Sequence, residues 1–182
     1  MISDLHLGHA NIIRYCNRPY STLEEMDSTL ISNWNRIVSK GDTVYYLGDL
    51  AFGRGSKHYV EEANQILNGK ITFIRGNHYD PPDAIAGPLE IKYSGRRFIL
   101  SHWPEDVPPP SPSFTSDSDT WLIHGHHHNN HPDVFPFINR QRKTINVSVE
   151  VIGYKPVEIS QICKFLDDGV KWMDTIESTR LP

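Results

Sequence analysis

The chain has 182 residues, of which 38% are hydrophobic and 22% are charged, and it carries a formal net charge of −4 at pH 7. These values are typical of one globular domain over residues 1–182, and they argue against a broadly basic surface for duplex nucleic acid. Two widely spaced cysteines argue against a disulfide framework, and the lack of a long apolar run or signal segment argues against membrane insertion and secretion, so we expect a cytoplasmic protein.

The amino-terminal part of the chain predicts a short strand followed by a helix. Only three residues precede Asp4, so either the first strand is very short or residues are missing before it. Residues 21–24 (Ser-Thr-Leu-Glu) read as a capping box, which is typical of a helix start. Apolar residues then recur at helical spacing to about Val38, so we expect an amphipathic helix there.

A strand–helix–strand unit is predicted next. Residues 43–47 form a short β-branched and aromatic run that indicates a buried strand, and residues 70–74 indicate another. A helix is expected between them at residues 57–67, with Asn68-Gly69 as its stop. This spacing predicts parallel pairing of the two strands through a right-handed crossover.

The later part of the chain is richer in predicted strands. Residues 89–93 and 97–100 flank Ser94-Gly95-Arg96 and indicate a hairpin. Residues 104–119 are rich in Pro, Ser and Asp without periodicity, so we expect a surface loop. Further elements are expected as strands at 120–124, 144–151 and 170–173 and as a helix at 159–166.

Five polar motifs recur in order, and each follows a predicted strand. They are Asp4-Leu5-His6, Gly48-Asp49, Gly76-Asn77-His78, Ser101-His102 and Gly125-His126-His127-His128. In open α/β sheets, ligands bind beyond the carboxyl ends of the strands, where loops can carry functional groups. Carboxylate, imidazole and amide groups are the mixed oxygen and nitrogen donors of hydrolases that activate water with divalent metals. The motifs therefore predict a metal-dependent hydrolytic site.

This series of motifs resembles the calcineurin-like metallophosphoesterase superfamily, whose pattern is D-x-H, G-D, G-N-H, a lone His and G-H-x-H. The resemblance runs from Asp4 to His128, and residues 4–19 are similar to the small capless phosphoesterases of bacteria and phages. It implies a four-layer α/β/β/α sandwich of two mixed sheets, with the metals at one edge between the sheets. The residues by themselves indicate only an α/β chain with a β-rich later half.

The resemblance also implies two divalent metal ions and a residue-by-residue site. One metal would be bound by Asp4, His6 and His128, the other by Asn77, His102 and His126, and Asp49 would bridge both. A hydroxide bridging the metals would be the nucleophile. His78 would not bind metal but would stabilise the phosphoryl oxygens or protonate the leaving alkoxide. We expect manganese to be the bound metal, although the same donor set also suits Fe, Zn and Ni.

Other polar side chains near these motifs have two interpretations each. His9, Asn11 and Arg18 are candidates for binding substrate, but the first two could cap a helical turn and Arg18 could pair with a surface carboxylate. Trp103 could be a wall on which substrate stacks, or a lid over the site.

Three further residues are expected outside the ligand set. His127 should point away from its two ligand neighbours, because side chains alternate along an extended segment. His124 is expected in the core or behind the ligands, and Asp80 could orient His78.

We expect hydrolysis of a phosphoester, with a small phosphodiester or nucleotide as the first choice of substrate. A phosphomonoesterase, a protein phosphatase or a nuclease could use the same site. A metallo-β-lactamase type of hydrolase is a remote alternative, because His128 stands where its H-x-H-x-D-H pattern requires Asp. A scaffold without turnover is another, although such scaffolds usually lose ligands that are present here.

Overall fold

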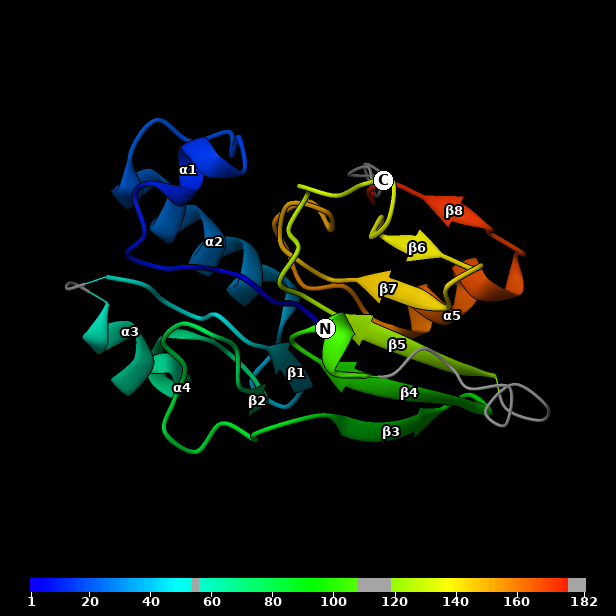
Figure 1. The fold of residues 1–182 in the computed structure, drawn as a ribbon. Helices are drawn as coiled ribbons and strands as arrows, with labels where there is room; N and C mark the ends of the chain where they lie inside the picture. The colour runs from blue at the N-terminus through cyan, green and yellow to red at the C-terminus, as the bar shows by residue number, and fades with distance from the viewer. Residues whose placement is uncertain (54–55, 108–118, 177–182) are drawn as a thin grey trace.

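The structure, a computed structural model, describes residues 1–53, 56–107 and 119–176 (Figure 1). In chain order the elements are α1 (Ile12–Tyr15), α2 (Leu23–Ile37), β1 (Thr43–Leu47), α3 (Lys57–Glu61), α4 (Ala63–Ile66), β2 (Lys70–Ile74), β3 (Leu89–Tyr93), β4 (Arg96–Ser101), the 3-10 helix η1 (Pro104–Asp106), β5 (Thr120–His124), β6 (Ile138–Asn139), β7 (Thr144–Asn146), α5 (Ile159–Asp167) and β8 (Trp172–Met173).

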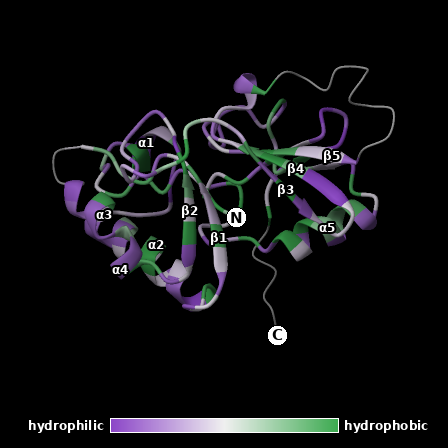
Figure 2. Cartoon of the chain, turned by 90° about the horizontal axis from the view of Figure 1, so that it is seen from below, coloured by the Kyte–Doolittle hydropathy of each residue, from purple (hydrophilic) through white to green (hydrophobic). Residues whose placement is uncertain are grey.

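The strands form two sheets with helices on their outer sides. The smaller sheet is the parallel pair β1–β2, and the larger is a mixed sheet in the order β3-β4-β5-β7-β6-β8. Helices α2, α3 and α4 lie beside the smaller sheet and α5 lies against the larger one (Figure 1, Figure 2). This arrangement confirms the α/β/β/α sandwich. Hydrophobic residues run through β4 and α5, whereas α3 is mostly hydrophilic (Figure 2).

A capping hydrogen bond marks the start of helix α2, and one apolar face of the helix is buried. The Thr22 side chain accepts a hydrogen bond from the amide of Glu25, whose carboxylate accepts one from the amide of Ser21. The capping box therefore begins one residue later than predicted, because the chain enters the helix after Thr22. The buried apolar side chains of the helix are Met26, Leu30 and Trp34.

The strand–helix–strand unit has the predicted strands but an interrupted helix. Strands β1 and β2 have the predicted bounds and pair in parallel. The single helix expected at residues 57–67 is wrong, since α3 and α4 are separated at Glu62. That residue has a backbone outside the helical region, with φ −107° and ψ 8°.

In the later part, the hairpin and strand β5 are confirmed and the next strand is shorter than predicted. The β3–β4 turn has positive φ at Ser94 (49°) and Gly95 (77°), as two-residue hairpin turns require. Residues 108–118 of the expected surface loop lie outside the described residues. Strand β7 ends at Asn146 because the Asn146 side chain accepts bonds from the amide and hydroxyl of Ser148, which turns the chain out of the ladder.

The amino-terminal segment joins the two sheets. Ile2 bridges to Tyr46 in β1, and Ser3 bridges to Ser148 beyond β7, both in parallel. The first strand is therefore reduced to these bridges, and Asp4 leaves the sheets at their common edge. Within the described ranges, the helices are too short or too polar to cross a membrane.

Candidate metal centre

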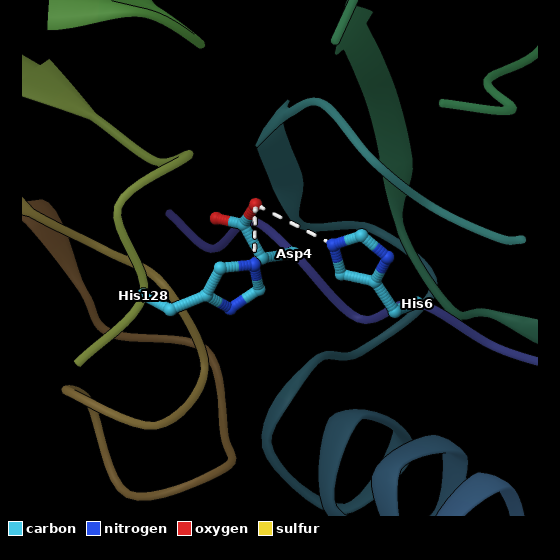
Figure 3. Close-up of side chains that lie close together, drawn as sticks. All are labelled: Asp4, His6 and His128. Carbon is cyan, nitrogen blue, oxygen red and sulfur yellow. Dashed lines mark ion pairs between the residues drawn. The ribbon is translucent and has the colours of Figure 1, made fainter. Parts of the chain in front are cut away.

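The predicted ligands converge on two aspartates. The Oδ1 atom of Asp4 lies 3.8 Å from Nε2 of His128 and 3.9 Å from Nε2 of His6 (Figure 3). The Oδ2 atom of Asp49 lies 3.5 Å from Nε2 of His6 and 3.5 Å from Nε2 of His102. His6 therefore faces both carboxylates, and the two aspartates lie in one continuous cluster.

The remaining ligand candidates meet at the amide of Asn77. Its Oδ1 lies 3.0 Å from Nε2 of His102 and 3.1 Å from Nδ1 of His126. The structure thus brings together both groups of ligand candidates that the resemblance implied. One group, Asp4, His6 and His128, is buried. In the other group His102 is buried too, but Asn77 is exposed and His126 is half-buried, so this group has a side that faces solvent.

The hydrogen-bonding pattern of the histidines fits divalent cations. The described residues offer neither ring nitrogen of His6 a hydrogen-bond partner, although the residue is only 2% exposed. In His102, Nδ1 lies 2.7 Å from the Leu47 carbonyl oxygen, which can only accept a hydrogen bond, so Nε2 of the neutral ring presents its lone pair. Lone pairs and carboxylate oxygens that face each other in this way need a positive charge between them.

The pKa values show the same preference for positive charge. Burial alone would lower the pKa of His128, but Asp4 and Glu150 raise it to about 11. Burial also opposes protonation of His102, but the hydrogen bond to Asp49 and the charge of Asp4 raise its pKa to about 9. The carboxylates therefore favour a cation at these nitrogens, and a divalent ion would take the place of the protons.

Five of the predicted ligands have a left-handed backbone. They are Asp4 (φ 61°), His6 (52°), Asp49 (62°), His126 (70°) and His128 (50°). This conformation costs roughly 1–2 kcal/mol for a residue with a side chain and is concentrated at functional sites. Gly48 has φ +88°, and a Cβ there would lie 2.5 Å from Nδ1 of His102, so only glycine allows the two loops to approach this closely.

Two side chains outside the predicted set hold the loops in place. Asp80 accepts hydrogen bonds from the amides of Asp49, Leu50 and Gly76, so it joins the ends of β1 and β2 and does not act by orienting His78. The Tyr46 hydroxyl accepts from the amide of Leu5 and donates to the carbonyl of Asp49. Neither role follows from sequence spacing.

Arg18 takes a different position from both interpretations of the sequence. It is 4% exposed and pairs with Glu150, which is also buried, so its carboxylate partner is not at the surface and its guanidinium group is not exposed to solvent. Sequence reasoning missed Glu150, which binds Nδ1 of His128. The sequence did carry a signal that Glu150 is buried and paired, because it lies between Val149 and Val151 and a carboxylate inside an apolar run needs a buried partner.

The other candidates lie around the cluster. The His9 ring lies 5.5 Å from that of His6 and 4.2 Å from that of Phe52. Asn11 is at the start of α1, is exposed, and makes no side-chain cap hydrogen bond among the described residues, so the capping interpretation does not hold for Asn11. The Trp103 ring lies 4.9 Å from that of His102 and 5.7 Å from that of His126, beside the solvent-facing group.

Two histidines in and next to the last motif, His127 and His124, lie outside the cluster. His127 binds Glu105 at 2.7 Å and stacks on Phe135 at 4.1 Å. His124 is fully buried at the end of β5, and its Nδ1 donates to the carbonyl of Gly125.

Known proteins match the chain over most of its length. The model of the calcineurin-like phosphoesterase family matches residues 1–167. An uncharacterized protein of Methanocaldococcus jannaschii is 50% identical over 170 residues, which are 93% of this chain and 91% of that protein. The gene 66 protein of Mycobacterium phage L5 is 37% identical over 103 residues, or 56% of this chain and 45% of the phage protein. The crystal structure of a protein of unknown function from Aquifex aeolicus has a TM-score of 0.65 and 26% identity, and the match covers 90% of this chain and 96% of that one.

Proposed function

The chain belongs to the calcineurin-like phosphoesterase family, whose activity is metal-dependent phosphoester hydrolysis, and from this premise we propose that it hydrolyses a small phosphodiester with two divalent metal ions. The observation that carries the proposal is the position of Asp49. Its Oδ2 lies 3.5 Å from both His6 and His102, which belong to different groups of ligand candidates. A carboxylate in that position can serve two ions at once.

The ligands of the two ions follow from this division. Asp4, His6 and His128 would hold the buried ion, Asn77, His102 and His126 would hold the solvent-facing one, and Asp49 would serve both. Bound there, the ions would supply Lewis-acid stabilisation of the phosphoryl oxygens and activation of water. Manganese is our first choice, since the mixed donors suit several transition metals.

His78 is positioned to act on the leaving group. Its amide is fixed by Oδ1 of Asp49 at 2.9 Å, and its ring packs edge-on against Phe52 at 4.7 Å. The side chain is 31% exposed, so the ring reaches solvent beside the cluster. We assign His78 the protonation of the leaving alkoxide, which requires hydrogen-bond reach of a bound substrate.

A row of aromatic rings beside His78 supports a substrate that carries a flat ring. It consists of Phe52, His9 and Tyr15, in which the His9 ring lies 4.2 Å from Phe52 and 6.1 Å from Tyr15. Tyr15 is 66% exposed, so one end of the row is open to a ligand. Such rings stack on aryl groups and nucleobases alike, which favours an aryl or nucleoside diester.

A substrate screen with manganese tests this function. We expect bis(4-nitrophenyl) phosphate and nucleoside 2′,3′-cyclic phosphates to be hydrolysed at least tenfold faster, by kcat/KM, than 4-nitrophenyl phosphate. Excess chelator should abolish the activity. Phe52→Ala should raise KM for the nucleoside substrate, while Tyr93→Ala, at the end of β3, should not change it. A preference for the monoester would contradict the diester assignment, and the absence of any metal-dependent release would favour the binding scaffold.

A further inference from the structure

A buried ion pair lies directly behind the candidate metal centre. Nε of Arg18 lies 2.8 Å and its Nη2 lies 2.7 Å from Oε1 of Glu150, which is 132 positions later in the chain. The two side chains are 0% and 1% exposed. Removing two charges from water is so unfavourable that a buried pair is weak evidence for stability by itself. Its other contacts therefore indicate what it does.

The pair contacts both chain segments that carry the ligand candidates of the buried ion. Arg18 donates from Nη2 to the carbonyl of Asp4 at 2.7 Å and from Nη1 to the carbonyl of Leu5 at 2.8 Å. These carbonyls belong to the two peptide bonds that link Asp4 to His6. At the other end, both carboxylate oxygens of Glu150 lie 3.1 Å from Nδ1 of His128. The ion pair thus connects the Asp4–His6 segment to His128.

These contacts hold a strained backbone in place and stop the imidazole ring of His128 from rotating. Asp4, His6 and His128 all have positive φ, so their backbone needs bonds that hold it in place. A carboxylate accepts the Nδ1 proton of His128, which fixes the ring and leaves the Nε2 lone pair toward Asp4. The ligands of the buried ion are therefore positioned before the ion binds.

Other hydrogen bonds hold the ligand candidates of the solvent-facing ion. His102 is held by the Leu47 carbonyl, and the amide of His126 donates to Oδ2 of Asp4 at 3.0 Å. Within the part of the chain that the structure describes, no hydrogen bond joins Asn77, His102 or His126 to the Arg18–Glu150 pair. Loss of the pair should therefore affect the two ions unequally.

A third metal is not the explanation of the cluster. Cys16, His128 and Glu150 place possible ligand atoms within 4.8 Å of one another. However, the guanidinium of Arg18 already lies against Glu150, and a divalent ion there would meet a buried positive charge. The Glu150 carboxylate serves Arg18 and His128 instead.

We infer that the Arg18–Glu150 pair is a positioning device that sets the affinity of the ion held by Asp4, His6 and His128 and has much less effect on the other ion. The inference rests on the dinuclear centre proposed above. Partners that orient metal ligands typically contribute 10–100-fold in metal affinity. The chain would accordingly hold a tight, preorganised ion in the interior and a weaker one at the solvent side.

Metal titration of Glu150→Gln tests the inference. Calorimetry with Mn²⁺ should show two equivalents in the wild-type protein, with one dissociation constant raised at least tenfold in the variant and the other within twofold. At two equivalents of Mn²⁺, electron paramagnetic resonance should report the same change, as the exchange-coupled pair of the wild type gives way to isolated ions in the variant. Asp27→Asn is the matched control, because Asp27 is also buried but binds Gly8 and Tyr59.

A second variant separates positioning from folding. Glu150→Gln leaves Arg18 as an unpaired buried charge, whereas Arg18→Gln with Glu150→Gln removes both charges. If the metal-free double variant melts near the wild type yet one ion remains weak, positioning is supported. Equal weakening of both ions, or two unchanged ions, would overturn the inference. If the wild-type protein binds only one ion, the dinuclear proposal is overturned instead. If the affinity for that single ion is also unchanged in Glu150→Gln, the inference is overturned as well.

Discussion

One oxygen of Asp49 accepts a 2.9 Å hydrogen bond from the backbone amide of His78, and its other oxygen lies 3.8 Å from the ring of the same histidine. The amide therefore fixes the carboxylate so that Oδ2 points into the histidine cluster. Burial would raise the pKa of Asp49, but the hydrogen bond and charge of His102, with further help from His6, lower it well below its usual range. The bridging candidate is thus held ionised beside the candidate acid.

Asp49→Ala should lose both metal ions, because Oδ2 of Asp49 lies 3.5 Å from a histidine of each group of ligands. Metal content after gel filtration, measured by mass spectrometry, should fall from two ions per chain to fewer than one. Asp27→Ala is the control for the loss of a buried carboxylate. Circular dichroism should show that each variant is folded. Full metal content in Asp49→Ala would contradict the bridging assignment.

His78→Ala should keep its metals and lose about 10²–10⁴ in kcat, the usual contribution of a general acid. The loss should be smaller for nitrophenolate, which leaves readily, than for alkoxide leaving groups. The control is His127→Ala, since His127 binds Glu105 outside the cluster.

Metal analysis decides between the two roles open to His78. With His6 and Asp49, His78 places possible ligand atoms within 4.8 Å. Loss of an ion from His78→Ala would therefore make it a ligand. An equal loss of rate across all leaving groups would favour electrostatic stabilisation over proton transfer.

The sequence predicted the parts of the site that depend on local pattern. The bounds of β1, β2 and β5 are confirmed, because each is a short apolar run that ends at a glycine or polar motif. Since the ends of such strands meet at one edge, the clustering of Asp49, Asn77 and His126 followed from their order in the chain.

The sequence could not reveal the contacts that join distant segments. The partners Arg18 and Glu150 are 132 positions apart, so the apolar neighbours of Glu150 indicate that it needs a buried partner but not that the partner is Arg18. The bonds of Asp80 and Tyr46 to loop backbone depend likewise on how the loops meet. Strand β7 is shorter than its apolar pattern indicated because the Asn146 side chain binds Ser148.

The stability of the metal-free protein should fall between pH 6.5 and about 4 in part because of His124. Burial lowers the pKa of His124 to about 4, with smaller opposing and supporting contributions from its neighbours. The ring is therefore neutral when folded, whereas the unfolded chain takes up a proton near pH 6.5. Its contribution is complete above pH 6.5 and is lost as the pH falls toward about 4, at up to about 1.4 kcal/mol per pH unit.

Urea unfolding of His124→Leu measures this contribution. Between pH 7 and pH 4.5, with chelator present, wild-type stability should fall by about 2 kcal/mol more than that of the variant. His58→Leu, on the exposed side of α3, is the control and should follow the wild type. Parallel slopes for wild type and His124→Leu would show that His124 does not titrate in this way.

Turnover of a small diester should change little as salt rises from about 50 to 200 mM. The net charge is −4, and in the basic run at residues 96–97 both arginines pair with carboxylates, Arg96 with Asp119 and Arg97 with Glu90. Arg18 is buried against Glu150 and cannot contribute to a track for phosphates. Duplex binding depends on many Lys and Arg contacts with phosphates, which release counterions and make affinity steeply salt-dependent. The measurement is kcat/KM for a nucleoside cyclic phosphate across the salt series, with cleavage of long RNA and DNA measured in parallel. Rapid cleavage of the polymers, strongly suppressed by salt and accompanied by little action on the cyclic phosphate, would show that the substrate is a nucleic acid.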